Sequence, residues 1–534
     1  MKSLILCALF APIVILALRQ KKWYLYLLFA FIAVLPEQFS IKIHDSIPLL
    51  SATRILILIM TGFWLYDKWK TKTFRFPKSV ILFFVVSLIV SLVNLRFGAQ
   101  EIKRIFLLIF ERVLLVIMIM DMIKDRGEFH RCIDFAIMGC VTLAVIGIVQ
   151  TVFSYDISTA LHLTKTVTSI QLSKRMDLVR AFGTYNAISF GCYCSVMALV
   201  ILYRLYNTKS IWHSIAFALN FVALICTFTR SAWLCLAGVA FIILLVYRGK
   251  LITRMLPSVA MVMALLVTLC LFQPTLYKAF VETGKSSINT IINAVPDSVI
   301  TLLIPNTNQS QTDPSATQPS QTLQTEPDQT LQTETDQSLQ TEPEQTEPAP
   351  TEPSPSRPQF ELDTNFGANA SDPTYSRTAQ WTAIEYMRQE GELLFGYGYN
   401  ALPRGKIHFF FDRWAAKWQP TTFLDVGFVA MLTESGLVGT LAYLCLFANL
   451  FVYAFRKKSS LKKRELDFFW LTFFMIPLYM CLNYLASFPN AQAVWLFISM
   501  FYAYQKLDSL EAANNHANTK YWLVSFRKID KPEA

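Results

Sequence analysis

Charged residues are scarce in this chain of 534 residues. Asp, Glu, Lys and Arg together make up 16% of it, against roughly 25% in an ordinary soluble domain. Hydrophobic residues reach 54%, and the mean hydropathy is +0.40. A chain of this composition has too little polar surface to face water on all sides. The composition therefore excludes an ordinary soluble domain and favours a protein buried in a lipid bilayer.

The sequence also lacks the signatures of disulfide, metal and nucleotide sites. All ten cysteines, from Cys7 to Cys481, fall in or beside apolar runs, in no disulfide or metal-thiolate spacing. The glycines of the FGYGYN segment are not followed by Lys-Ser or Lys-Thr, so they do not form a phosphate loop. The polar loops contain no Asp-x-Asp cluster. We expect no catalytic metal and no cofactor.

Apolar runs close to the ~20 residues that cross a bilayer recur along the chain. The N-terminal run, 1–18, lacks a small-x-small cleavage site and is followed by Arg19, Lys21 and Lys22, so it reads as a first membrane helix and not as a signal peptide. The predicted spans are 3–18, 23–36, 49–66, 79–95, 105–121, 132–153, 183–203, 211–228, 231–247, 255–272, 424–455, 466–485 and 490–505. The sequence thus predicts an all-α polytopic membrane protein with about 12–14 transmembrane helices.

Positive charge sets the expected orientation. Basic clusters lie in alternate short loops, for example at 68–78, 124–131 and 456–464, and the positive-inside rule places these loops in the cytoplasm. The resulting organisation has about ten spans in 1–272, one large extracytoplasmic loop at 273–422, about three spans in 423–505 and a cytoplasmic tail at 506–534. The net charge of +11 then reflects loop bias, and no nucleic-acid partner is expected.

The large loop has two parts. The segment 305–358 holds nine acidic residues against Arg357 alone, and it contains the octapeptide repeats QTLQTEPD, QTLQTETD and QSLQTEPE. It has nothing apolar to bury, so we expect it to be a disordered spacer. From about 360 to 422 the composition becomes globular again, which predicts a structured part.

Arg230 is the most informative single residue, because it lies between two apolar runs with almost no loop around it. An arginine at membrane depth costs roughly 2.5–3.5 kcal/mol on insertion scales. It either extends its side chain to the interface or serves an anionic partner. Glu111 and Arg112 raise the same question in the middle of the fifth span, where they either satisfy other buried groups or line a pathway for a lipid carrier.

Four segments occur in an order that carries a family resemblance. They are RAFGTYN from Arg180, CTFTRSAW around Arg230, YSRTAQWTAIEYM with FGYGYN, and LDVGFVAMLTESGLVG from Leu424. The chain in this region resembles the O-antigen ligase and bacterial polysaccharide polymerase superfamily, from Arg180 to about Tyr453 with the acidic spacer as an interruption. The resemblance implies a C-type glycosyltransferase-like fold in the bacterial cytoplasmic membrane.

The same resemblance implies an activity. Such enzymes transfer a glycan from undecaprenyl pyrophosphate to an acceptor sugar hydroxyl on the outer face of the membrane, with inversion at the anomeric carbon. Arg180, Arg230 and Arg377 match the arginines of the family motif and would bind the departing pyrophosphate, since a guanidinium holds phosphate oxygens bidentately. The expected partners are a polyprenyl-pyrophosphate-linked glycan donor, a glycan or surface-carrier acceptor and the lipid bilayer.

The catalytic base is less clearly marked. Many ligases carry a His-Asn pair where this chain has Asp425 and Val426, so Asp425 is one candidate base and His408 is a second. Glu434 is a further site candidate near the end of a membrane helix. Tyr375 and Trp381 are either packing residues or a sugar-stacking surface, and Arg377 could be an ordinary loop cation.

A transporter or flippase of a lipid-linked glycan or small anion is the main alternative, because it would also need many helices and interior arginines. Against it, the sequence shows no inverted repeat and no pair of interrupted helices in corresponding halves. A non-enzymatic envelope scaffold is a weaker third reading.

Overall fold

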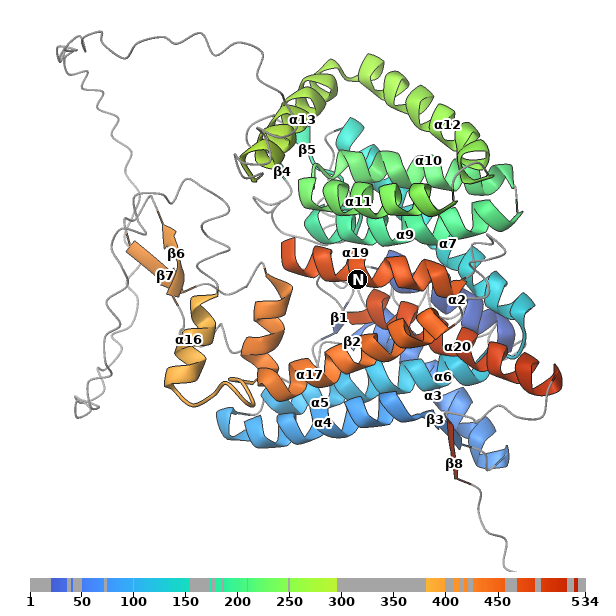
Figure 1. Cartoon of the computed structure of the whole chain (residues 1–534), viewed down its shortest axis with the longest axis vertical. Coiled ribbons are helices and arrows are strands. Elements are labelled where there is room, and N and C mark those ends of the chain that lie inside the picture. The colour runs from blue at the N-terminus through green and yellow to red at the C-terminus, as the bar shows by residue number, and fades with distance from the viewer. Residues whose placement is uncertain are drawn as a thin grey trace, which may run out of the picture. The chain divides into compact units, whose positions relative to one another are not determined.

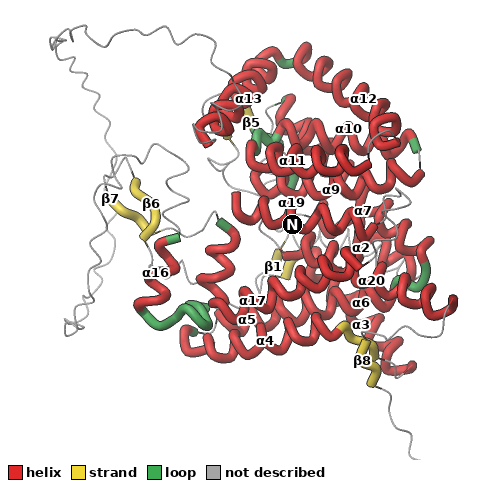
Figure 2. The backbone as a smooth tube through the Cα atoms, viewed as in Figure 1, coloured by secondary structure: helices red, strands yellow, loops and turns green. Residues whose placement is uncertain are grey.

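The computed structural model is mostly helical (Figures 1 and 2). It describes residues 21–35, 40–41, 50–71, 74–98, 100–153, 172–173, 178–184, 187–208, 210–247, 250–294, 381–398, 408–412, 417–420, 426–456, 468–485, 491–515 and 523–526. The chain divides into one unit of Met1–Ser287 with Ala370–Ala534 and a second of Ile288–Asn369. The site described below belongs to the first unit.

Helices occupy every predicted span that falls on described residues. Their bounds are α2 Lys21–Val34, α3 Ala52–Thr71, α4 Lys78–Asn94, α5 Gln100–Leu107, the π-helical η2 Leu108–Val113, α6 Leu114–Met122, α7 Arg126–Val152, α9 Ala187–Thr208, α10 Ile211–Cys226, α11 Arg230–Tyr247, α12 Lys250–Phe272, α13 Pro274–Ala294, α16 Thr382–Gln389, α17 Gly427–Arg456, α19 Phe468–Leu485 and α20 Ala491–Asn515. The first predicted span, 3–18, lies outside the described residues.

Six described helical segments are long and apolar enough to cross a membrane. They are 78–97, 126–152, 187–208, 230–247, 251–272 and 427–453, and three shorter apolar helices accompany them at 22–32, 211–226 and 473–482. This architecture is compatible with an all-α polytopic membrane protein. The helix count of 12–14 stays a prediction.

One group of helices packs around α9. Of its most apolar window, 94% is buried within the protein, against 17% for α12. Helix α9 contacts α7, α10, α11, α12 and α19, while α4, α6, α17 and α20 run alongside one another in a neighbouring layer (Figure 1). The central position of α9 places its N-terminal end beside the α10–α11 turn that carries Arg230.

Ion pairs gather at the bundle end that the sequence places in the cytoplasm. Lys68 pairs with Asp121 at 2.6 Å, and Arg126 pairs with Glu511 at 2.6 Å. Lys506 donates from Nζ to the carbonyl oxygen of Met120 at 2.9 Å, at the end of α6. Loops that the positive-inside rule assigned to one side therefore lie at one end of the bundle. Which end faces the cytoplasm stays a prediction.

Two boundaries differ from the expected organisation. Helix α20 continues to Asn515, ten residues into the predicted tail, and α13 forms a helix at the start of the predicted large loop. Both extensions carry polar residues among apolar ones. A prediction based on hydropathy alone ends a span where such polar residues begin. In the tail, β8 (Leu523–Phe526) pairs antiparallel with β3 (Phe74–Pro77), which joins α3 to α4.

The remaining strands form short antiparallel pairs. Strand β1 (Ser40–Ile41) pairs with β2 (Leu50–Ser51), and β4 (Leu172–Ser173) pairs with β5 (Leu178–Val179). Strand β6 (His408–Asp412) pairs with β7 (Lys417–Pro420). This last hairpin, α16 and the segment 390–398 that follows it lie within the part of the loop predicted to be structured, 360–422. The predicted spacer at 305–358 lies outside the described residues.

Candidate functional site

Arg180 follows β5 directly, and its side chain is held against the turn between α10 and α11. Its Nε atom donates to the carbonyl oxygen of Thr227 at 2.7 Å, and Nη2 donates to Oγ1 of Thr229 at 3.1 Å. The neighbouring backbone is fixed too, because the amide of Ala181 donates to the carbonyl oxygen of Cys226 at 2.9 Å. The guanidinium is thus positioned by groups that directly follow the C-terminal end of α10.

The turn that receives Arg180 has a constrained backbone. Phe228 has φ of +51°, which non-glycine residues adopt rarely. Thr229 fixes the turn from both sides, since its Oγ1 donates to the carbonyl oxygen of Ala187 at 3.1 Å and its amide donates to Oγ1 of Thr227 at 3.2 Å. Gly191 on α9 leaves room for this approach, because a Cβ there would lie 2.9 Å from Oγ1 of Thr227.

Arg230 is the first residue of α11, one position after Thr229. The structure therefore brings the chain at Arg180 and at Arg230 to one turn, at the N-terminal end of a helix. The backbone N–H groups of a first helical turn carry partial positive charge and favour anions. Both side chains are partly buried. We call Arg180, the turn 227–229 and Arg230 the arginine turn.

Burial lowers the pKa of Arg180 to about 10. Desolvation causes the shift, because removing water disfavours the charged form of a base. Arg180 nevertheless keeps its charge at neutral pH. The arginine turn can therefore offer positive charge and hydrogen-bond donors to an anion.

A second feature lies at the break in α17. Gly436 has φ of 62° and ψ of −173°, so α17 consists of two helical arms, 427–435 and 437–456 (Figure 1). A loop from the glycine-rich FGYGYN segment packs into the break. The amide of Tyr397 donates to the carbonyl oxygen of Thr433 at 2.8 Å, and the amide of Leu437 donates to that of Leu393 at 2.9 Å.

The glycines permit this packing. Gly396 has φ of +76°, and a Cβ there would lie 2.6 Å from the amide nitrogen of Gly436. Gly398 has φ of +86°, and a Cβ there would overlap the carboxylate of Glu101. Gly396 and Gly398 therefore allow a turn and a close backbone approach that a side chain would prevent. Gly436 in turn admits the 393–398 loop, because a Cβ there would overlap the backbone of Leu394.

Glu434 lies two residues before the break and is partly buried. Its carbonyl oxygen accepts a hydrogen bond from Nη1 of Arg104 at 2.9 Å. The same Nη1 atom lies 3.7 Å from Oε2 of Glu101, so Arg104 and Glu101 form an ion pair. Asn94 completes the group by donating from Nδ2 to the carbonyl oxygen of Phe395 at 2.7 Å. Glu434 therefore belongs to a polar cluster that holds the loop against the broken helix.

Sequence reasoning missed Asn94, Glu101 and Arg104. The available signal was the charged stretch immediately before the fifth predicted span, which includes Glu101 and Arg104 on the side where the topology rule does not favour positive charge. Glu101 is fully buried. A buried carboxylate needs partners, and here Arg104 is one of them.

The other candidates are less informative. Trp381 is 39% exposed and precedes α16, whose first turn begins with the amide of Ile384 donating to its carbonyl oxygen at 3.1 Å. His408 is the first residue of β6, opposite Pro420. Tyr375, Arg377 and Asp425 lie outside the described residues. Over the described ranges no group of three His, Cys, Asp or Glu residues is arranged to hold a metal ion.

Glu111 is buried inside the bundle and forms an ion pair with Arg54 on α3, so it satisfies another charged group there. Arg112, the next residue, points its guanidinium at the ring of Trp495 on α20, with 5.9 Å between Cζ and the ring centroid. Both residues belong to η2, whose wider π-helical turn interrupts the α-helix between α5 and α6.

Comparison of the chain with protein-family models, with curated proteins and with solved structures found no match.

Proposed function

We propose that this protein transfers a glycan from a polyprenyl-pyrophosphate carrier to the hydroxyl of an acceptor, at the outer face of the bacterial cytoplasmic membrane. The observation that carries the proposal is the arginine turn. It joins a positioned guanidinium, a second arginine and a helix N-terminus at the end of the bundle opposite the ion-paired basic end.

The proposed reaction is a displacement at the anomeric carbon. The acceptor oxygen forms the new bond while the bond from that carbon to the pyrophosphate oxygen breaks, which inverts the configuration. The electron pair leaves with the pyrophosphate, where negative charge grows, and Arg180 and Arg230 stabilise that charge. The acceptor proton passes to a base, for which Asp425 and His408 are the candidates.

The polar cluster at the α17 break supports a second element of this proposal. A helix interrupted at a glycine, with a loop hydrogen-bonded into the gap, can hold irregular backbone within a membrane protein because that backbone is covered by protein. Asp425 comes two residues before the first arm of α17 in sequence. We infer that the loop and this arm help to form the acceptor side of the site.

The test uses purified full-length protein in nanodiscs with a polyprenyl-pyrophosphate oligosaccharide. We expect a longer covalent glycan product and release of polyprenyl pyrophosphate in equal amounts, without an ion gradient. Arg230→Ala should lower the rate by about 10²–10³-fold, the loss typical when one charge-stabilising donor is removed. Arg131→Ala, which removes an exposed arginine near the basic end of α7, serves as the matched control.

Transport is the alternative that the same preparation can detect. An interrupted helix is also common in transporters, and α17 is one. Movement of the intact lipid-linked glycan across vesicles, with no covalent product, would replace the proposed enzyme by a flippase. Full activity of Arg230→Ala would remove the arginine turn from the reaction.

A further inference from the structure

A cavity of about 450 Å³ lies at the ion-paired end of the bundle, between α2, α3, α7 and the turn that joins α6 to α7. Helix α2 contacts both α3 and α7 there, and α3 contacts α6 (Figure 1). The volume is far larger than the roughly 10–15 Å³ that holds a single water. The proposed glycan transfer takes place at the other end of the bundle and does not use this cavity.

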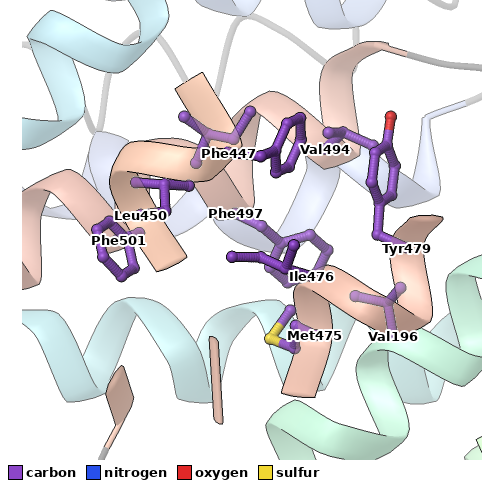
Figure 3. A pocket seen from close by; sticks show the side chains of 10 residues that line it. Val196, Phe447, Leu450, Met475, Ile476, Tyr479, Val494, Phe497 and Phe501 are labelled. Atoms are coloured by element: carbon purple, nitrogen blue, oxygen red, sulfur yellow. The ribbon is translucent and has the colours of Figure 1, made fainter. Parts of the chain in front are cut away.

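A second cavity, between α9, α17, α19 and α20, differs in size and in chemistry (Figure 3). Its volume is about 50 Å³, which leaves room for little more than a water-sized group. Its described lining is apolar apart from the hydroxyl of Tyr479, which lies 2.6 Å from the hydroxyl of Tyr443. The small cavity therefore offers a ligand neither room nor charge, whereas the cavity at the ion-paired end offers both.

Lysine side chains set the charge of the larger cavity. Its described lining carries four ammonium groups and three carboxylates, an excess of one positive charge. The lysines are Lys22, Lys68, Lys70 and Lys124, and the acidic residues are Asp67, Asp121 and Glu128. A cavity with this balance favours an anion over a cation or a neutral ligand.

Two of the carboxylates are already engaged within the protein. Glu128 pairs with Lys22 at 2.5 Å, and it also accepts a hydrogen bond from the backbone amide of Lys124 at 2.9 Å. Asp121 pairs with Lys68 at 2.6 Å. These contacts neutralise two of the four lysines and leave the other two for a ligand.

The ammonium groups of Lys70 and Lys124 form no ion pair with any residue that the structure describes. Both side chains are exposed, and they belong to different walls of the cavity, α3 and the α6–α7 turn. Asp67 is the remaining carboxylate of the lining, so the two ammonium groups outnumber it. Lysine is a common partner of phosphate, to which it offers a compact positive charge.

Tyr26 adds a hydrogen-bond donor to the wall formed by α2. Its side chain is 5% exposed, and its hydroxyl is buried with no hydrogen-bond partner in the described ranges. The ring is held by stacking on Phe135, with ring centroids 5.3 Å apart, and the hydroxyl interacts electrostatically with Lys22. Buried polar atoms without partners are few in native proteins and point to a ligand or a water. A phenolic O–H can donate to a phosphate oxygen.

Exposed tryptophans indicate that the cavity lies at the level of the membrane surface. Trp23 follows Lys22 in α2 and is 42% exposed, and Trp69 lies between Lys68 and Lys70 in α3 and is 85% exposed. Tryptophan gathers where the bilayer meets water, with its ring at the level of the lipid headgroups. The position of these residues therefore favours a lipid headgroup over a free anion as the occupant of the cavity.

We propose that the cavity between α2, α3, α7 and the α6–α7 turn binds the phosphate headgroup of an acidic membrane phospholipid such as phosphatidylglycerol. Lys70 and Lys124 supply positive charge, and Tyr26 supplies a hydrogen bond. Apolar lining residues such as Met60 and Phe63 contact the carbon atoms next to the phosphate. Basic pockets between membrane helices suit anionic headgroups in this way. The site goes beyond the proposed glycan transfer, and lipid binding does not depend on that reaction.

The test measures binding of phosphatidylglycerol to delipidated full-length protein in a neutral detergent, by native mass spectrometry over a lipid titration. The double variant Lys70→Gln/Lys124→Gln should weaken binding by about thirtyfold, since each lysine close to an anionic lipid contributes roughly fivefold. The matched control is Lys278→Gln/Lys285→Gln, which removes the same charge from exposed positions on α13. Unchanged affinity in the first variant, or an equal loss in both, would overturn the proposal.

Tyr26→Phe tests the hydrogen bond separately, because it removes the hydroxyl and keeps the ring. The thermal midpoint without lipid should not fall, since that hydroxyl has no hydrogen-bond partner among the described residues. The affinity for phosphatidylglycerol should fall by about tenfold, the contribution of one hydrogen bond to a charged group. Unchanged affinity would exclude this hydroxyl from the site, whatever the midpoint.

Two competitors distinguish the source of the phosphate. Phosphatidylcholine should displace phosphatidylglycerol poorly because its headgroup carries no net charge, and glycerol 3-phosphate should do so poorly because it lacks the acyl chains. Displacement by glycerol 3-phosphate at the concentration of the lipid would assign the cavity to a soluble phosphate and overturn the lipid. Equal displacement by phosphatidylcholine would overturn the role of the two lysines.

Discussion

The backbone of Gly436 lies directly against the backbone of Leu394, so that a Cβ atom at position 436 would overlap the carbonyl oxygen of Leu394. This contact joins the interrupted helix α17 to the glycine-rich loop before it. The φ and ψ angles of Gly436 also belong to a region that is essentially restricted to glycine. Both the close approach of the loop and the backbone conformation therefore require glycine at position 436.

Gly436→Ala should therefore destabilise the protein by at least about 1–3 kcal/mol, the usual cost of a strained backbone residue, with steric overlap adding to it. The measurement is the thermal midpoint of purified protein in detergent. Gly238→Ala is the control, because a Cβ at Gly238 in α11 meets nothing within 4 Å and alanine is the better helix former. Equal midpoints for Gly436→Ala and wild type would show that the loop does not pack into the break as described.

Arg180→Lys should change the pH dependence of transfer. Burial lowers the pKa of Arg180 to about 10, and a comparable desolvation would also lower the pKa of a lysine at this position, which starts from a lower ordinary value than that of arginine. The cationic form is lost as the pH rises through the pKa. Wild-type Arg180 should keep its charge up to about pH 10, whereas the variant should lose activity at a lower pH than the wild type. Parallel pH profiles would argue that this charge does not act in the reaction.

Asp425→Asn should reduce the turnover number by about 10²–10⁴-fold, the usual contribution of a general base. His408→Gln should have a much smaller effect, because we take Asp425 as the first candidate. Single-turnover assays with saturating acceptor separate this loss from weaker acceptor binding. The opposite ranking of the two variants would move the base to His408.

The proposed orientation predicts which cysteines an impermeant thiol reagent can reach in intact cells. With the native cysteines blocked or replaced, Thr330→Cys in the acidic repeat should react from outside. Ser460→Cys, in the basic loop after α17, should react only after the membrane is permeabilised. Labelling of Ser460→Cys in intact cells would invert the topology and place the arginine turn in the cytoplasm.

Much of the helical framework could be predicted because bilayer-length apolar runs are a one-dimensional signal. The alternation of basic loops was equally readable, and Lys68, Asp121 and Arg126 do lie together at one end. The break at Gly436 could not be predicted from the sequence, because the residues on both sides of it belong to one continuous apolar run. The same holds for the ends of α20 and α13, where polar residues continue a helix that has left the apolar pattern.

The candidate site could be predicted only in part. The order of motifs suggested that Arg180 and Arg230 act together, and the structure ties Arg180 to the turn before Arg230. Their role in binding pyrophosphate stays a prediction. The polar cluster of Asn94, Glu101 and Arg104 depends on contacts between residues some 300 positions apart, as in the bond from Asn94 to Phe395. A single sequence carries no direct record of such contacts.

The ion-paired end of the bundle has a consequence for biosynthesis. Lys506 and Glu511 on α20 are made after all the other described helices, yet they bind the end of α6 and the start of α7. A nascent chain must therefore hold Arg126 and the last carbonyl groups of α6 without these partners until α20 has been made. We expect chains that stop before α20 to remain open at this end and to be recognised by membrane quality control.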